Sequence, residues 1–379
     1  MWSNIIGQQR VKEILGNIFS SGKISHAYLF YGNEGTGKDA AAIEFSKLLN
    51  CDNPDMLTGA CDNCKNCKET DSFRSPLFRY IIALPSGKNE SEEDFNPIEK
   101  LDREDFNNYL NEIEFKTYDK YHKINLPGAN DIRISSIRQI KKDIYLTGKT
   151  GKKKIFLISN CEKMNQNSSN ALLKILEEPP KDSLLILTTS KLSSLLPTII
   201  GRCQKIKFAG IEKNLIKEFI NSGNENISEA EAEFYADLSE GSITKCNEIL
   251  GKNFLGLREK VIDLLAYLIT NQYLKLGNEI DFITGKKDKD RIRQFLILLN
   301  VWFRDIICMK SGNESDIINK DKADRIRKFA ENFESDDYDI ISITEEAVRD
   351  LDNNIFPDLI FYNLVFNIKS KLRKKANIQ

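Results

Sequence analysis

Runs of apolar residues alternate with helical patterns along the first half of the chain. Helical spacing runs from Val11 to Phe19, with Gly22 as its expected end, and again over residues 40–49. The apolar runs that predict buried strands lie at residues 27–31, 78–84, 155–158, 184–188 and 204–208. Strands that alternate with helices are typical of a parallel sheet covered by helices. We therefore expect an α/β domain with a parallel five-stranded sheet over residues 1–208.

After Gly210 strand patterns become sparse and helical periodicity takes over. Three short segments, 214–220, 229–238 and 243–250, predict a small helical lid over residues 209–252. Residues 253–379 predict further helices, forming an all-α domain with polar breaks at 285–290, 311–316 and 334–339. The basic run that contains Lys369, Lys371, Arg373, Lys374 and Lys375 is expected to be a frayed, solvated helix end, with an electrostatic role near DNA as the alternative.

The strand at 27–31 runs directly into Gly32-Asn33-Glu34-Gly35-Thr36-Gly37-Lys38. The spacing G-x-x-x-x-G-K between a strand and a helix is that of a phosphate-binding loop. Backbone N–H groups of such a loop and the helix N-terminus attract an anion, and Lys38 would add a positive charge. The next residue is Asp39, where a Ser or Thr hydroxyl would hold Mg²⁺. We expect a vestigial loop (Gly32, Gly35, Thr36, Gly37 and Lys38) with weak or absent ATP binding.

Four of the eight cysteines form the pattern Cys51-x9-Cys61-x2-Cys64-x2-Cys67. Thiolates two residues apart suit tetrahedral Zn²⁺, because one tight turn aims both sulfurs at one ion. The alternative is that these cysteines are free thiols in a polar loop. That is a poor explanation for three cysteines within seven residues. We predict a structural zinc module over residues 51–67, since all four ligand positions are filled.

Composition narrows the class of protein. The chain has 379 residues, 41% of them hydrophobic, which is enough for two or three domains. No apolar run is long enough to span a membrane, and the N-terminus has no signal-peptide pattern, so a cytoplasmic location is expected. The formal net charge of −1 means that any contact with nucleic acid must be local.

Residues 86–128 are predicted to be an insertion. Its stretch 88–120 is acidic and irregular, with a short helix expected at 105–115. A solvated surface excursion is the favoured interpretation and a partner-binding role the alternative. His122 at its far end and His26 before the first strand are expected to do no chemistry. Ser135 is expected to cap a helix that carries Ile137, Ile140 and Ile144.

Together these stretches resemble the AAA+ subunits of bacterial clamp loaders, and within that family the delta-prime class of DNA polymerase III. The resemblance implies an AAA+ domain, a lid and a C-terminal helical collar in a hetero-oligomer. The implied partners are subunits of gamma/tau and delta type, the sliding clamp and primer-template DNA, with no membrane. The stretches that carry the resemblance are Ile5–Gln8, His26–Phe30 with the loop that follows, the cysteine module, Asn170–Pro180, Arg202-Cys203, Trp302–Asp305 and Asp352–Asn354.

Departures from the family pattern indicate a subunit that does not hydrolyse ATP. Ser159 and Asn160 stand where active members have Asp-Glu, which holds Mg²⁺ and orients water. Glu162 lies two residues beyond and is a poor substitute. In the lid, Thr244 falls where active members carry an arginine. Together with Asp39 these are three separate losses, and removing a single preorganised charge from such a site typically costs about 10²-fold or more in rate.

Arg202, in contrast, matches a residue of the family pattern. The resemblance implies that it acts in trans as an arginine finger, reaching the nucleotide site of a neighbouring subunit; a surface ion pair at a strand edge is the alternative. Thr188 and Thr189 lie where the family has a polar sensor residue. The candidates for DNA contact are Arg133, Ser135 and Arg138, through phosphates; two solvated arginines on an amphipathic helix would give the same pattern.

Two other functions remain open from the sequence. One is an ATP-hydrolysing gamma/tau-type subunit, against which Asp39, Ser159 and Asn160 argue. The other is a zinc-dependent DNA-binding protein with a decayed ATPase fold, in which replacement of Cys61 and Cys64 would abolish DNA binding rather than only stability.

Overall fold

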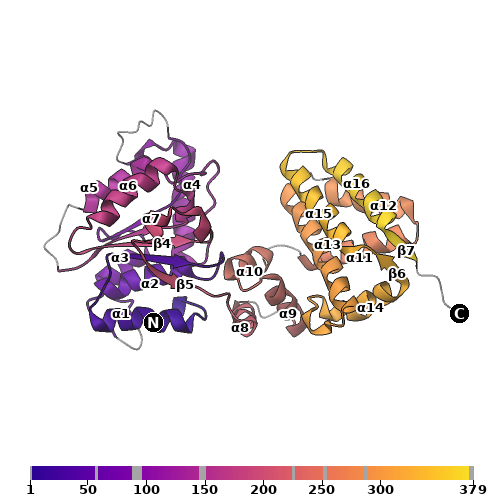
Figure 1. The fold of residues 1–379 in the computed structure, drawn as a ribbon, viewed down its shortest axis with the longest axis horizontal. Coiled ribbons are helices and arrows are strands. Elements are labelled where there is room, and N and C mark those ends of the chain that lie inside the picture. The colour runs from indigo at the N-terminus through magenta and orange to yellow at the C-terminus, as the bar shows by residue number, and fades with distance from the viewer. Residues whose placement is uncertain are drawn as a thin grey trace. The chain divides into compact units, whose positions relative to one another are not determined.

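A computed structural model of the chain describes residues 2–55, 59–87, 96–144, 151–223, 227–250, 254–285 and 288–374. The chain forms two compact units, which are described separately (Figure 1). The first comprises Met1–Phe219 with Ser239–Lys245, and the second comprises Ile220–Leu238 with Cys246–Gln379. The three-part division expected from the sequence stays a prediction. Among the described residues, no helix is long and apolar enough to cross a membrane.

The first unit contains the predicted parallel five-stranded sheet, with strand order β2-β3-β4-β1-β5. In its centre, β1 pairs with β4 and β5, so Leu29 lies opposite Leu187 and Lys205. All four pairings are parallel, which confirms the fold class. The strands are β1 Ala27–Tyr31, β2 Phe78–Ile81, β3 Lys154–Ile158, β4 Ser183–Thr189 and β5 Gln204–Lys207.

Strand β2 ends three residues earlier than its apolar run suggests, at Ile81 instead of Leu84. Ile82 and Leu84 are still buried, but in a separate cluster with Leu126 of the predicted insertion. The apolar pattern therefore predicted the burial of these residues correctly but overestimated the length of the strand. A buried residue need not pair with a neighbouring strand.

Helices cover both faces of this sheet (Figure 1). Side chains of β1 alternate between the two faces, as expected for a strand: Tyr28 and Phe30 pack in the core that includes residues of α1 and α2, while Ala27 and Leu29 pack on the opposite side. Gly22 ends α1 with φ 66°, as predicted. The helices are α1 Gln9–Ser21, α2 Lys38–Asn50 and α3 Lys65–Asp71, and, beyond the insertion, α5 Ile134–Ile144, α6 Gln166–Glu177 and α7 Pro197–Ile200.

The insertion differs from the predicted solvated excursion. Its helix α4, Arg103–Tyr118, is longer than expected, and the chain turns inward at its end. Lys116 and Tyr121 are only 4% and 7% exposed, and Tyr121 lies against the phosphate loop. The expectation is therefore wrong for this end of the insertion, whereas residues 88–95, with several of its acidic side chains, lie outside the described residues.

Ser135 does not have the predicted position at a helix end. Helix α5 begins at Ile134, so Ser135 already lies inside the first turn. Its side chain is 1% exposed. The prediction that Ser135 caps this helix is therefore wrong, and a buried hydroxyl is not placed to contact a DNA phosphate.

The second unit is helical. The longest helix, α13, packs against α11, α14 and α15, and it buries Phe295 and Phe303 completely. Two short helices, α8 Lys213–Gly223 and α10 Ile243–Leu250, are divided between the units. The remaining helices are α9 Glu229–Leu238, α11 Phe254–Ile269, α12 Tyr273–Thr284, α13 Lys289–Lys310, α14 Ala323–Asn332, α15 Asp337–Asp352 and α16 Pro357–Lys371.

A two-stranded antiparallel sheet in this unit was not predicted. It pairs β6, Phe333–Ser335, with β7, Leu372–Lys374. The basic run was expected to continue α16 as a solvated helix end, but α16 stops at Lys371. Three-residue strands show no clear side-chain alternation, so the pattern could not have revealed them.

Candidate functional site

The candidate site lies where the parallel strands β1, β3 and β4 end. In an open α/β sheet, ligands bind at this edge. The loop that follows β1 needs its glycines: Gly35 and Gly37 have φ of 72° and 90°. A Cβ at Gly32 would lie 2.2 Å from the Phe208 carbonyl oxygen, so a side chain there would clash with backbone. The local sequence therefore builds the predicted loop between β1 and α2.

Lys38 is turned into its own loop. Its Nζ donates hydrogen bonds to the carbonyl oxygens of Gly32, at 2.8 Å, and Asn33, at 2.6 Å. The side chain is 7% exposed, and this burial lowers its pKa although three nearby carboxylates act in the opposite direction. An anion in the loop would have to displace these two hydrogen bonds before it could pair with Lys38.

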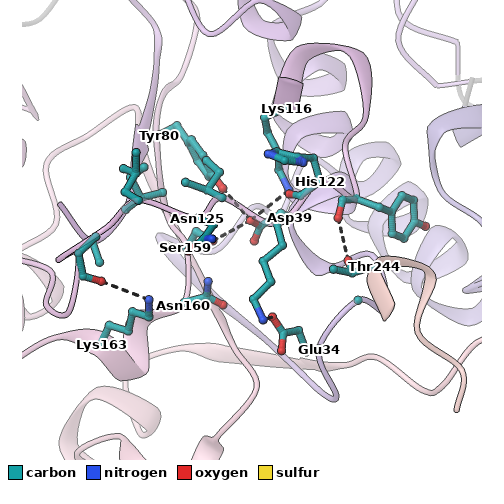
Figure 2. Close-up of a pocket in the computed structure, with 18 of the residues that line it drawn as sticks. Glu34, Asp39, Tyr80, Lys116, His122, Asn125, Ser159, Asn160, Lys163 and Thr244 are labelled. Atoms are coloured by element: carbon teal, nitrogen blue, oxygen red, sulfur yellow. Dashed lines mark hydrogen bonds and ion pairs between the residues drawn. The ribbon is translucent and has the colours of Figure 1, made fainter. Parts of the chain in front are cut away.

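Asp39 is the centre of a hydrogen-bonded cluster (Figure 2). Its Oδ2 accepts from the hydroxyls of Tyr80, at 2.9 Å, and Ser159, at 2.7 Å. Its Oδ1 accepts from the Thr188 hydroxyl at 2.7 Å. The ammonium of Lys116, from α4, lies 3.9 Å from Oδ2. The position of a magnesium-binding hydroxyl is thus taken by a carboxylate that the chain itself saturates.

The electrostatics of this cluster keep Asp39 ionised. Burial works to raise its pKa, but the Lys116 ammonium and the three hydroxyl donors outweigh that effect and hold the pKa below its ordinary value. Burial is also the main cause of the lowered pKa of Lys116, which Asp39 opposes. An ammonium here does the charge-balancing that a bound cation would otherwise do.

The residues after β3 offer no replacement for the missing acidic pair. Ser159 is bound to Asp39, and the backbone N–H of Asn160 donates to Thr188 Oγ1 at 3.2 Å. Glu162 Oε1 accepts from the backbone N–H and hydroxyl of Ser190, at 3.1 and 2.7 Å, whereas its Oε2 is buried with no hydrogen-bond partner among the described residues. That Glu162 is a poor substitute for the acidic pair stays a prediction.

A cavity of about 400 Å³ lies beside the loop, and the insertion forms one of its walls. Thr244 lines it, and its hydroxyl donates to the backbone carbonyl of Tyr121 at 2.7 Å (Figure 2). His122, expected to do no chemistry, has its Nε2 2.9 Å from Glu112 Oε2. The sequence analysis did not predict that the insertion reaches this site; Tyr121 and Leu126 beside an acidic stretch were the available signal.

The four cysteines predicted as metal ligands come together. Cys51, Cys61, Cys64 and Cys67 place their sulfur atoms within 4.8 Å of one another. A tetrahedral Zn²⁺ with bonds of about 2.3 Å needs sulfurs about 3.8 Å apart, so the cluster fits such an ion with little adjustment. Backbone N–H groups, chiefly that of Cys64, lower the pKa of the Cys61 thiol to about 6. Burial raises the pKa of the Cys51 and Cys67 thiols, so all four groups would be thiolates only with a cation between them, which this donor set can hold.

A partly buried ion network connects this cysteine module to the phosphate-loop helix. Lys47 of α2 is 2% exposed, and its Nζ lies 2.6 Å from Asp62, 3.0 Å from Glu44 and 3.4 Å from Asp71. Asp62 sits in the turn between Cys61 and Cys64 with φ 58°. Lys120 of the insertion reaches the same Asp71 at 3.1 Å. The module, α2 and the insertion are therefore held by shared charges that the sequence pattern did not reveal.

Arg202 lies at the surface, just before β5. Its Nη2 is 2.8 Å from Glu177 Oε1 at the end of α6, and its Nη1 donates to the Thr198 carbonyl at 3.0 Å. The arginine side chain is 36% exposed. Within the described part of the chain these contacts use two of the five N–H groups of a guanidinium. Both interpretations fit: it forms a surface ion pair, and it is accessible to another subunit.

The three candidates for DNA contact differ in how exposed their side chains are. Arg133 is half-buried and donates to the Ser86 hydroxyl at 2.7 Å, and burial lowers its pKa. Arg138 is half-buried on α5, whereas Ser135 is buried. The structure brings the two arginines to one region of the first unit and removes Ser135 from direct contact.

Replacing Asp39 with asparagine is expected to lower the free energy of unfolding by about 3 kcal/mol at neutral pH, because Lys116 would remain charged and buried without its partner. The lowered pKa means that Asp39 stabilises the fold above an ordinary aspartate pKa of about 4, and that this stabilisation is lost as the pH falls through the lowered value. Urea unfolding across pH 3 to 8, roughly the range of aspartate titration and above, measures both effects.

The double variant Asp39→Asn with Lys116→Met is the control for that measurement. It removes both charges and should recover part of the lost stability. Equal stability of wild type and Asp39→Asn at neutral pH would show that the Asp39–Lys116 pair contributes nothing.

The sheet order, the loop after its central strand and the helices on both faces define an AAA+-type domain of the P-loop class. The chain belongs to the DNA polymerase III delta subunit family: that family matches residues 7–212, and the family described as its C-terminal domain matches residues 253–368. The resemblance to bacterial clamp-loader subunits is thereby confirmed.

Similar proteins include several subunits of the same polymerase. The DNA polymerase III subunit delta' of Bacillus subtilis is 27% identical over 330 residues, covering 85% of this chain and 84% of that protein. The subunit gamma of Buchnera aphidicola from Schizaphis graminum is 27% identical over 300 residues, covering 78% and 67%. Identity alone therefore does not separate the delta-prime from the gamma class.

Among solved structures, a DNA polymerase III gamma subunit-related protein of Thermotoga maritima is similar, with a TM-score of 0.48 and 17% identity. The match covers 95% of this chain and 99% of that one. A likeness of this degree carries no argument about function.

Proposed function

We propose that this chain is a delta-prime-type clamp-loader subunit that does not hydrolyse ATP and that supplies Arg202 to the nucleotide site of a neighbouring subunit. Its partners would be subunits of gamma/tau and delta type, the sliding clamp and primer-template DNA. The cysteine module would hold a structural Zn²⁺. The helices of residues 253–379 would form a collar with other subunits.

The Asp39 cluster is the observation that carries the non-hydrolysing part. Hydrolysis needs a metal that bridges the phosphates and a group that orients the attacking water. Asp39 instead binds three hydroxyls and lies beside the Lys116 ammonium, and the positions after β3 are Ser159 and Asn160. A magnesium ion would meet an ammonium at this site, which disfavours its binding.

The trans role of Arg202 rests on its accessibility and its weak restraint. An exposed ion pair such as that with Glu177, which is itself 50% exposed, contributes at most about 1 kcal/mol. The guanidinium can therefore change partners at low cost, while Glu177 and the Thr198 carbonyl hold it in a defined orientation. A planar fork of donors is suited to the oxygens of a transferring phosphoryl group.

The second unit offers a surface that suits assembly. Four large apolar residues at helical spacing at and along α16 are exposed: Phe356, Leu359, Tyr362 and Phe366. An exposed apolar face of this kind is typical of a protein–protein interface, as expected of a collar helix that packs against other subunits.

The zinc-dependent DNA-binding alternative finds less support. The cysteine module connects through Lys47 and Asp71 to the interior of its own domain. These contacts favour a structural role for the module over a role in DNA binding. The gamma/tau alternative would require a metal site where the Asp39 cluster lies.

Reconstitution of the clamp loader with Lys38→Ala in this chain tests the proposal. Because the loop is not used for ATP, clamp loading and ATP turnover by the assembly should stay within about twofold of wild type, where loss of a working P-loop charge costs about 10²-fold. The melting temperature of the variant confirms that it is folded. A fall in turnover of that larger size would show that this subunit uses its own nucleotide site.

A further inference from the structure

Tyr121 joins three segments of the first unit that are far apart in the sequence. Its hydroxyl accepts the backbone N–H of Ile6 at 2.8 Å. The same hydroxyl lies 2.7 Å from where a Cβ of Gly37 would be, so the phenol packs directly on the phosphate loop. Its backbone carbonyl accepts the Thr244 hydroxyl at 2.7 Å. One residue thus contacts the N-terminal segment, the loop and the segment that begins α10.

Two buried lysines that precede Tyr121 hold its segment in place through hydrogen bonds and ion pairs. Lys116 Nζ donates to the His122 carbonyl at 2.6 Å and faces Asp39 of α2. Lys120 Nζ donates to the carbonyls of Thr117, at 2.7 Å, and Asp71, at 3.1 Å. Both lysines are buried, at 4% and 7% exposed. Lysine side chains are rarely buried unless paired, and here each is held by carbonyl and carboxylate oxygens.

The segment around Thr244 has further contacts with the phosphate loop. The backbone N–H of Ile243 donates to the Gly35 carbonyl at 3.0 Å. A Cβ on Gly35 would lie 2.0 Å from the Ser242 hydroxyl, so the two stretches touch without space for a side chain. The loop is therefore enclosed by the chain on the side of Tyr121 and on the side of Ser242.

We propose that residues 116–121 form an intrachain strut that fixes the N-terminal segment, the phosphate loop and the Thr244 segment in one arrangement, whether or not a nucleotide is present. A ligand that bridges separate segments stabilises the arrangement to which it binds. Here the chain supplies the bridging groups itself, Tyr121 as the contact and Lys116 as the cation. The inference concerns the domain alone and does not require the trans role of Arg202.

Amide hydrogen exchange of the full chain tests the strut. In Tyr121→Ala, exchange at Ile6, in the loop at 33–38 and at 241–244 should rise together by about tenfold or more, since each segment loses a contact. In Tyr118→Ala, a matched change at a tyrosine of α4 that is 81% exposed, exchange in all three segments should stay at the wild-type rate. Adding Mg²⁺ and ATP to wild type should leave exchange at Ile6 and at 241–244 unchanged.

Two results would overturn the proposal. One is a rise in Tyr121→Ala that is confined to the neighbours of residue 121. The other is slower exchange at Ile6 and at 241–244 in wild type when Mg²⁺ and ATP are added, because a nucleotide would then be fixing what the strut is proposed to fix. Should Tyr121→Ala fail to fold, Tyr121→Phe decides: it removes only the hydroxyl that accepts from Ile6, so exchange at Ile6 should rise about fivefold, and an unchanged rate there refutes the strut.

Discussion

Replacing Arg202 with alanine in the reconstituted clamp loader is expected to reduce ATP turnover by about 10³-fold at the site that the residue serves, since an arginine finger contributes about that much to phosphoryl transfer. The protein should remain folded, because the residue is at the surface and its ion pair with Glu177 contributes little. The measurement is turnover of the assembly with clamp and primed DNA present, together with the melting temperature of the isolated chain.

Two variants sharpen this measurement. Arg202→Lys keeps the charge but lacks the planar fork, so it should recover only part of the rate. Lys205→Ala removes an exposed cation from neighbouring β5 and should leave turnover at the wild-type level. Equal turnover for Arg202→Ala and wild type would remove the trans role, and an equal loss for Lys205→Ala would show a general effect of surface charge.

Removing two ligands of the proposed zinc site should have the largest effect on stability. Structural zinc sites contribute folding free energy directly, and replacing Cys61 and Cys64 with serine should lower the unfolding free energy by at least about 3 kcal/mol. The loss should reach beyond the module, because Asp62 in the Cys61–Cys64 turn pairs with buried Lys47 of α2. Metal analysis of the purified chain, with chelator-dependent melting, measures the effect.

Cys308→Ser is the matched control for the metal experiment. Cys308 is half-buried and lies on α13 of the second unit, whereas the cysteine cluster belongs to the first unit. Its replacement should change neither the metal content nor the response to chelator. A wild-type chain that purifies from zinc-containing medium without any metal would contradict the structural zinc site.

The sequence predicted those parts of the fold that have a strong period or a complete motif. The five strands, the loop after β1 and the three short helices at 213–250 were predicted to within a few residues, except that β2 stops at Ile81. These elements are defined by continuous apolar runs, by helical spacing or by glycines that only one loop geometry needs. The cysteine cluster was predictable for a similar reason, because its spacing fixes which turns bring the sulfurs together.

The details of the candidate site could be predicted only in part. Asp39, Ser159 and Asn160 were recognised as departures, but their meaning as a cluster depends on Lys116 and Tyr80, which come from distant segments. The acidic composition of the insertion predicted a solvated excursion, whereas its buried Lys116 and Lys120 pair with Asp39 and Asp71, and Tyr121 packs on the loop. Long-range ion pairs such as Lys47–Asp62 leave no periodic signal in a single sequence.

ATP turnover by the isolated full chain tests the central claim most directly. Wild type and Lys38→Ala are compared with saturating Mg²⁺ and ATP, with the same preparation used to confirm folding. The account predicts that both show the same background rate, because the position for a metal is taken by the Asp39–Lys116 cluster. Turnover by wild type that Lys38→Ala abolishes would contradict it and would identify the chain as a subunit that hydrolyses ATP itself.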